Sequence, residues 1–153
     1  MMFPYRKNSH LKGYKYNQLG TYFITICTKN REKLLGEIIK EPDDLTLPKV
    51  KLNPISEVIE KFISSIEDTY ENVIVDQHVV MPNHLHLLIS LRDEKIQVLV
   101  IVRILKTLAT KSLGFSIWQT SFYDYIIRSD EDFRNAWEYI EMNPARREND
   151  DYY

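Results

Sequence analysis

The sequence predicts an α+β fold of the ferredoxin-like type, a split βαβ arrangement in which an antiparallel sheet carries helices on one face and a further helix follows at the C-terminus. Two observations support this prediction. Short segments rich in β-branched and aromatic residues alternate with longer segments in which apolar residues recur every three or four positions. In chain order these segments give one or two strands, a helix, two strands, a helix, a strand and a last helix. The length of 153 residues suits a single domain over 1–153.

The N-terminal part is predicted to begin with a basic arm. Residues 1–19 combine lysine, arginine and tyrosine without a clear period, so we expect an arm or loop there. Residues 21–28 are rich in β-branched and aromatic residues and follow Gly20, which predicts a strand. Residues 34–39 fit a short second strand. Two prolines and two aspartates then predict a loop over 41–51.

The centre of the sequence is predicted to form a helix and then a hairpin. Asn53 is a favourable N-cap and Pro54 a favourable first helical residue, and apolar residues then recur at helical spacing as far as Ile66. Residues 72–81 have the composition of a buried strand, and residues 84–91 form a second strand after a Pro-Asn turn. The two strands are therefore expected to pair.

The C-terminal part is predicted to add a helix, a strand and a last helix. Residues 95–113 have strand propensity in places, but their length and the spacing of their apolar residues favour a helix. Residues 122–127 predict a short strand. The last helix is expected to begin at Asp130, where acidic side chains suit the helix dipole. It is expected to end at Asn143, because Pro144 disfavours helical geometry at the residue before it.

Composition limits the class of protein. An apolar fraction of 44% and a charged fraction of 27% are typical of a globular chain and argue against a disordered, collagen-like or coiled-coil protein. The single cysteine, Cys27, cannot form an intramolecular disulfide, so we expect a cytoplasmic protein. No stretch approaches the roughly 18 uninterrupted apolar residues of a membrane span, so no membrane partner is expected.

The net charge of −2 does not by itself suggest a nucleic-acid partner, but the charges are unevenly distributed. Residues 1–40 carry eight basic and two acidic residues, and residues 77–128 carry six basic and three acidic residues. These two segments could meet on one face and form a groove for a polyanion. Scattered, solvated charge is the alternative.

The most informative motif contains two histidines. His84 and His86 are two positions apart in a predicted strand, so their side chains are expected to project from the same face, with Leu85 and Leu87 on the other. Two neutral imidazoles at this spacing can share one divalent metal ion. Two unrelated strand histidines are the alternative, because a His-x-His pattern is common.

A second motif lies on the predicted last helix. Tyr139 and Asn143 are four positions apart and are expected to share a helix face. If this helix and the histidine strand converge, Asn143 can add an oxygen ligand to the two imidazoles. Such a set leaves positions open for water and phosphate oxygens, which suits Mg²⁺ or Mn²⁺ better than a closed zinc site. Tyr139 would then be a nucleophile beside a metal that polarises a phosphodiester.

Several segments occur together in a specific order and spacing. They are residues 11–14, 22–31, 81–86 (Met-Pro-Asn-His-Leu-His), 118–119, 125–128 and 139–144 (Tyr-Ile-x-x-Asn-Pro). With these segments the chain resembles the REP-associated tyrosine transposases, which belong to the HUH single-tyrosine transposase superfamily. The resemblance covers residues 5–147.

The resemblance implies a ferredoxin-like fold and a metal-dependent single-stranded DNA endonuclease. It implies that a tyrosine attacks a backbone phosphate, forms a 5′-phosphotyrosine link and leaves a free 3′-OH, and that the link is resealed to another 3′-OH. By position, His84 and His86 match the paired metal ligands, Asn143 the third ligand and Tyr139 the nucleophile. The expected partner is single-stranded DNA, containing a hairpin, and both a monomer and a homodimer fit the superfamily.

Further basic residues are candidates for DNA contacts. The arm interleaves cations with tyrosines, which offers charge and stacking to a single strand, and two cations of the second helix could contact phosphates. These candidates are Arg6, Lys7, Lys12, Lys15, Arg103 and Lys106.

Two other functions are compatible with the same residues. One is a domesticated relative that binds DNA hairpins without cutting them. The other is an unrelated metal hydrolase that uses His84 and His86 with water as its nucleophile. Tyr123 and Tyr125 are rival nucleophiles, but they lie in a predicted strand without a ligand residue four positions away.

Overall fold

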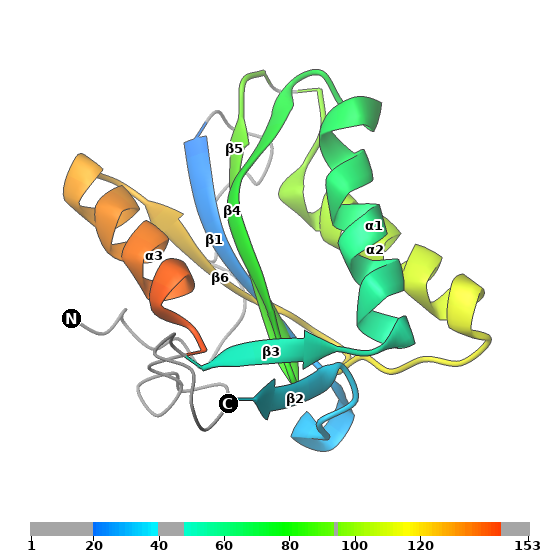
Figure 1. Ribbon diagram of the computed structural model, residues 1–153. Helices are drawn as coiled ribbons and strands as arrows, with labels where there is room; N and C mark the ends of the chain where they lie inside the picture. Colours follow the sequence, from blue (N-terminus) through cyan, green and yellow to red (C-terminus); the bar gives the residue numbers. More distant parts are fainter. Residues whose placement is uncertain (1–19, 40–47, 94, 145–153) are drawn as a thin grey trace.

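The computed structural model describes residues 20–39, 48–93 and 95–144 (Figure 1). The predicted arm, with Arg6, Lys7, Lys12 and Lys15, lies outside these residues. Within the described part of the chain, no helix is both long and apolar enough to span a membrane. The elements are β1 (Gly20–Cys27), the 3-10 helix η1 (Lys29–Arg31), β2 (Gly36–Ile39), β3 (Lys49–Leu52), α1 (Pro54–Thr69), β4 (Val73–Met81), β5 (His84–Leu91), α2 (Val98–Leu113), β6 (Tyr123–Ile127) and α3 (Asp130–Met142).

Four strands form an antiparallel sheet in the order β4-β5-β1-β6. Helix α1 connects β1 to β4, and β5 lies between these two strands, so the first βαβ unit is split. Helix α2 connects β5 to β6 across β1 in the same way. This is the ferredoxin-like arrangement, and the predicted fold class is confirmed.

The larger core lies between the sheet and the helices α1 and α2 (Figure 1). Alternate residues of the central strand β1, namely Tyr22, Ile24 and Ile26, point to this side and are fully buried. Helix α1 begins with a capping box, in which the side chains of Asn53 and Ser56 each accept a hydrogen bond from the other residue's backbone N–H. The Asn-Pro sequence therefore starts a helix, as predicted.

Helix α3 lies on the opposite face of the sheet (Figure 1). It packs through Ala136 and Ile140 against Phe23 of β1 and Leu88 of β5, which form a much smaller cluster than the first core. The helix begins after Ser129, whose hydroxyl accepts a hydrogen bond from a backbone N–H of the first turn. The C-terminal helix therefore covers the face that α1 and α2 leave open.

Strand β3 corrects the prediction of a loop over 41–51. Residues Lys49–Leu52 pair with β2 in a separate two-stranded sheet. Val50 and Leu52 are half-buried while Lys49 and Lys51 are exposed, so the alternation of a strand is present. It is only four residues long and follows a proline, which is why the sequence favours a loop.

Strand β4 contains a β-bulge. Its register with β5 shifts at Asp76, which is left without an opposite residue. The carboxylate of Asp76 accepts a hydrogen bond of 2.5 Å from Ser90, whose hydroxyl oxygen lies 2.7 Å from that of Thr21. Burial raises the pKa of Asp76 and the nearby charge of Glu67 raises it further, against the lowering effect of the Ser90 hydrogen bond.

Candidate active site

The two histidines of β5 lie side by side on the face that α3 covers. His84 and His86 are both fully buried, and their ring centres are 4.7 Å apart at an interplanar angle of 71°. Leu85 and Leu87, between and beyond them, belong to the larger core on the other face. Because side chains alternate along a strand, both imidazoles lie on the same face of the sheet as α3.

Each imidazole is held through its Nδ1 atom. Nδ1 of His86 lies 2.8 Å from the hydroxyl oxygen of Thr25, which stands opposite His86 in the β1–β5 register. Nδ1 of His84 lies 2.7 Å from the side-chain oxygen of Asn83. Metal-binding histidines are typically anchored in this way through the ring nitrogen that does not bind the metal. Nε2 is thus the atom through which either ring could hold a metal ion.

Tyr139 of α3 contacts His86 on the α3 side of the sheet. Its ring is edge-on to that of His86, with centres 5.4 Å apart, and edge-on to that of Phe23 at 5.7 Å. Phe23 in turn stacks on His86 at 5.1 Å. Tyr139 is only half-buried. The candidate nucleophile and a candidate metal ligand are therefore neighbours, although they come from separate elements.

Asn143 lies one turn further along the same helix. It is the C-cap of α3, is 8% exposed, and its side-chain nitrogen donates a hydrogen bond of 3.0 Å to the carbonyl oxygen of Tyr139. The described residues contain no cluster of three or more His, Cys, Asp or Glu side chains that could hold a metal ion. A third protein ligand beside the two histidines would therefore be of another kind, such as the amide oxygen of Asn143.

The turn before His84 is held by η1 and the segment that follows it. The backbone oxygen of Asn83 accepts hydrogen bonds of 3.0 Å from both the N–H and the hydroxyl of Thr28. The N–H of Leu35 donates to the carbonyl oxygen of Pro82 at 2.9 Å. The sequence suggested only a turn at this point, so the roles of Asn83 and Thr25 were missed. The position of Asn83 directly before His84 was the available signal.

No family model matches the sequence. The chain is 31% identical to an uncharacterized protein of Haemophilus influenzae, over 97% of this chain and 93% of that protein. It is 25% identical to a second H. influenzae protein, provisionally assigned as a REP-associated tyrosine transposase, over 83% of this chain and 71% of the relative.

Two solved structures share the fold of this chain. A solved structure of a REP-associated tyrosine transposase bound to a REP hairpin matches with a TM-score of 0.65 and 24% identity, covering 95% of this chain and 74% of that chain. In sequence and in fold, the chain is similar to REP-associated tyrosine transposases. A Deinococcus radiodurans protein, provisionally assigned as a transposase, shares the fold with a TM-score of 0.52 and 17% identity, over 88% of this chain and 96% of that chain.

The two cations predicted to contact DNA from α2 lie on the face of the sheet opposite to α3. Arg103 is exposed, whereas Lys106 is half-buried and donates hydrogen bonds to the carbonyl oxygens of Gln119, at 2.8 Å, and Ser121, at 3.3 Å. Burial lowers the pKa of Lys106, while nearby Cys27 has a raising effect. Both cations line a cavity of about 260 Å³, and the structure does not bring them to the histidine face.

The two rival tyrosines of β6 have other surroundings. Tyr125 packs in the small cluster beneath α3, and its hydroxyl donates a hydrogen bond of 3.5 Å to Asp132. Tyr123 stands opposite Thr25 on β1 and is half-buried. The tyrosine ring that contacts His86, at 5.4 Å, belongs to Tyr139 of α3.

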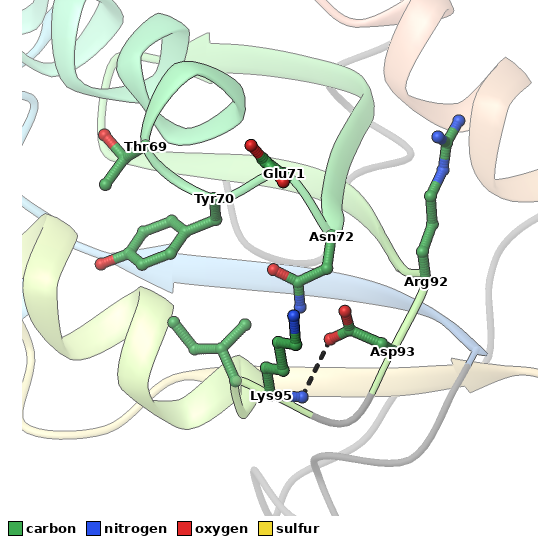
Figure 2. A pocket seen from close by; sticks show the side chains of 8 residues that line it. Thr69, Tyr70, Glu71, Asn72, Arg92, Asp93 and Lys95 are labelled. Carbon is green, nitrogen blue, oxygen red and sulfur yellow. Dashed lines mark hydrogen bonds between the residues drawn. The ribbon is translucent and has the colours of Figure 1, made fainter.

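A separate cavity of about 520 Å³ lies at the other end of the sheet, between the end of α1 and the segment that follows β5 (Figure 2). Arg92 and Lys95 bring positive charge to its lining, and Glu71 and Asp93 bring negative charge. Asp93 also accepts a hydrogen bond of 2.9 Å from the backbone N–H of Lys95. The histidines lie at the beginning of β5, whereas the cavity lies beyond its end at Leu91. The cavity therefore does not belong to the candidate active site.

Proposed function

We propose that the protein is a metal-dependent single-stranded DNA endonuclease and strand transferase that forms a 5′-phosphotyrosine intermediate at sites flanking DNA hairpins. The observation that carries this proposal is the contact between the rings of Tyr139 and His86, at 5.4 Å. It brings the ring of Tyr139 on α3 beside that of His86 on β5. The relative whose structure contains a REP hairpin supports DNA hairpins as the partner.

The residues fit a divalent metal of the Mg²⁺ or Mn²⁺ type. Nε2 of His84, Nε2 of His86 and the side-chain oxygen of Asn143 would be the protein ligands. All three are neutral, so the ion would keep its full charge toward a phosphate, and an incomplete set leaves positions for phosphate oxygens and water. The buried Nδ1 anchors support this use of the imidazoles. When bound, the metal would polarise the phosphodiester and offset the negative charge that develops during attack.

Tyr139 supplies the attacking oxygen. Its hydroxyl oxygen forms a bond to phosphorus and releases its proton, while the bond from phosphorus to the 3′ oxygen breaks and that oxygen takes up a proton. The products are a strand whose 5′-phosphate is joined to the tyrosine and a strand that ends in a free 3′-OH. In the reverse sense, a 3′-OH attacks the phosphotyrosine and restores both a phosphodiester and the tyrosine. One phosphoester replaces another in each step, so no external energy source is needed.

The contacts to Tyr139 suit this role. The rings of Phe23 and His86 both contact the Tyr139 ring edge-on, which fixes the direction of that ring. Tyr139 is half-buried, whereas the histidines are fully buried. A phosphate of a single strand that reaches this surface would therefore meet Tyr139, the most exposed of the three side chains.

The DNA would be held mainly by charge and stacking. The arm residues Arg6, Lys7, Lys12 and Lys15, interleaved with tyrosines, are the candidates on the N-terminal side. Arg103 on α2 is exposed and remains a candidate, whereas Lys106 is engaged with backbone carbonyls.

The test is incubation with hairpin-bearing single-stranded oligonucleotides and Mn²⁺, followed by denaturing electrophoresis. We expect a covalent protein–DNA adduct that resists denaturation and is absent from Tyr139→Phe. Cleavage without an adduct would identify a hydrolase that uses water. Hairpin binding without cleavage would identify a binding protein. Either result would contradict the proposal.

A further inference from the structure

We infer that Asn83 is a positioning residue for the metal site, because its side chain fixes the His84 imidazole in the tautomer that presents Nε2 as the binding nitrogen. The inference rests on the proposed function and adds a residue to it. Asn83 would act through His84 and would itself touch neither metal nor DNA.

The orientation of the Asn83 amide follows from two contacts. Its Nδ2 atom donates a hydrogen bond of 3.3 Å to the carbonyl oxygen of Arg31, which has no proton to give. Its Oδ1 atom must then be the one that lies 2.7 Å from Nδ1 of His84. Because an amide oxygen can only accept, the proton between them belongs to the imidazole.

The tautomer of His84 follows from this proton. A neutral imidazole has one N–H, so a proton on Nδ1 leaves the lone pair on Nε2, where a metal ion can use it. The hydroxyl of Thr25, opposite His86, can both donate and accept, so it fits either tautomer of His86. Of the two anchors, Asn83 alone dictates the position of a proton.

Asn83 is itself firmly placed. It is 2% exposed, and its backbone oxygen accepts two hydrogen bonds from Thr28. Arg31 adopts a left-handed φ of 55° at the end of η1, next to the residues that turn back toward Pro82. Because His84 is fully buried, an imidazole N–H that loses its acceptor there has no easy access to water.

The experiment measures the tautomer and the metal affinity separately. In metal-free, ¹⁵N-labelled protein, the imidazole ¹⁵N shifts of His84 should show a protonated Nδ1 and an unprotonated Nε2. Calorimetric titration with Mn²⁺ should show a loss of about 10- to 100-fold in affinity for Asn83→Ala, the range typical of residues behind a metal ligand. Asn83→Asp keeps an acceptor at this position and should retain the tautomer and most of the affinity.

Asn72→Ala is the matched control, since Asn72 lies at the far end of the sheet and should leave both readouts unchanged. Thermal unfolding of each variant verifies that it is folded. A proton on Nε2 of His84 in the metal-free wild type would overturn the inference even if Asn83→Ala did not fold. Equal Mn²⁺ affinity in the wild type and a folded Asn83→Ala would also overturn it. Absence of Mn²⁺ binding by the wild type would instead contradict the proposed metal site.

Discussion

The ring of Tyr139 stands edge-on to the ring of His86, with 5.4 Å between their centres. One residue belongs to the last helix and the other to the second strand of the central hairpin. This contact joins a candidate nucleophile to a candidate metal ligand, and it also gives a geometric criterion for variants. A substitution that keeps the tyrosine ring should leave the packing of α3 in place.

Tyr139→Phe should abolish the covalent adduct while leaving DNA binding within a few-fold of wild type. The change removes one oxygen atom and retains the ring that contacts Phe23 and His86. Denaturing electrophoresis measures the adduct, and fluorescence anisotropy with a labelled hairpin oligonucleotide measures binding.

Tyr123→Phe and Tyr125→Phe are the matched controls and should still form the adduct. Tyr125→Phe also loses the hydrogen bond to Asp132, so a small decrease in melting temperature is expected for that variant alone. Mass-spectrometric mapping of the adduct to either residue, or full cleavage by Tyr139→Phe, would exclude Tyr139 as the nucleophile.

His84→Ala and His86→Ala should each remove detectable Mn²⁺ binding, because each deletes one of only two nitrogen ligands. His78→Ala is the control. His78 lies on β4 with its Nε2 atom 2.8 Å from a carboxylate oxygen of Glu60 on α1, so it faces the other side of the sheet. Equal Mn²⁺ affinity in all three variants and the wild type would rule out the site.

Lys12→Glu/Lys15→Glu should weaken binding to single-stranded DNA and flatten its dependence on salt. Removing a cation that neutralises one phosphate should reduce the slope of log K against log salt by about 0.7. Blunt duplex DNA of the same sequence should bind less tightly than the single strand. Equal affinity for the duplex would show that the arm does not act by binding and stacking on a single strand.

Lys106→Ala and Arg103→Ala should separate stability from DNA binding. Lys106 donates to two backbone carbonyls, and a hydrogen bond to a charged group contributes about 1.5–3 kcal/mol, with partial exposure favouring the lower end. Lys106→Ala should therefore lower the free energy of unfolding by about 1–2 kcal/mol in urea titrations. Arg103 is exposed, and Arg103→Ala should leave stability unchanged and alter DNA binding alone.

Asp76→Asn should stabilise the protein at neutral pH. Because burial raises the pKa of Asp76 in the folded chain, the folded state retains a proton that the unfolded chain has released, and stability falls as pH rises above the ordinary value of 3.8. Asparagine keeps an oxygen for Ser90 and cannot ionise. Thermal unfolding at a series of pH values should show a flatter profile for the variant. A lower melting temperature than wild type at neutral pH would contradict this account.

Much of the fold was predictable because its signals are local. The period-two pattern from His84 predicts Leu85 and Leu87 on the face opposite to the histidines, and both lie in the larger core on that face. Strand β5 spans the predicted residues (His84–Leu91). The Asn53-Pro54 start of α1 is also encoded within a few residues. Strand β3 was missed because its four residues gain their pairing from β2 alone.

The environment of the candidate site was less predictable because it depends on distant partners. Nothing near Asn83 in the sequence indicates that the carbonyl of Arg31 orients its amide. The helical spacing of Lys106 predicts a surface cation. Its hydrogen bonds are instead made to the carbonyl oxygens of Gln119 and Ser121, which lie more than ten residues further along the chain. Spacing along one element could suggest which residues carry the chemistry, but not which backbone groups hold them.

The unequal packing of the two faces of the sheet has a consequence for local opening. Helix α1 is embedded in the large apolar core, whereas α3 rests on a small cluster around Phe23 and Leu88. Amide hydrogens of α3 should therefore exchange with solvent sooner than those of α1. The tyrosine would then be carried on a helix that detaches at a lower free-energy cost than α1, while both histidines stay on the four-stranded sheet.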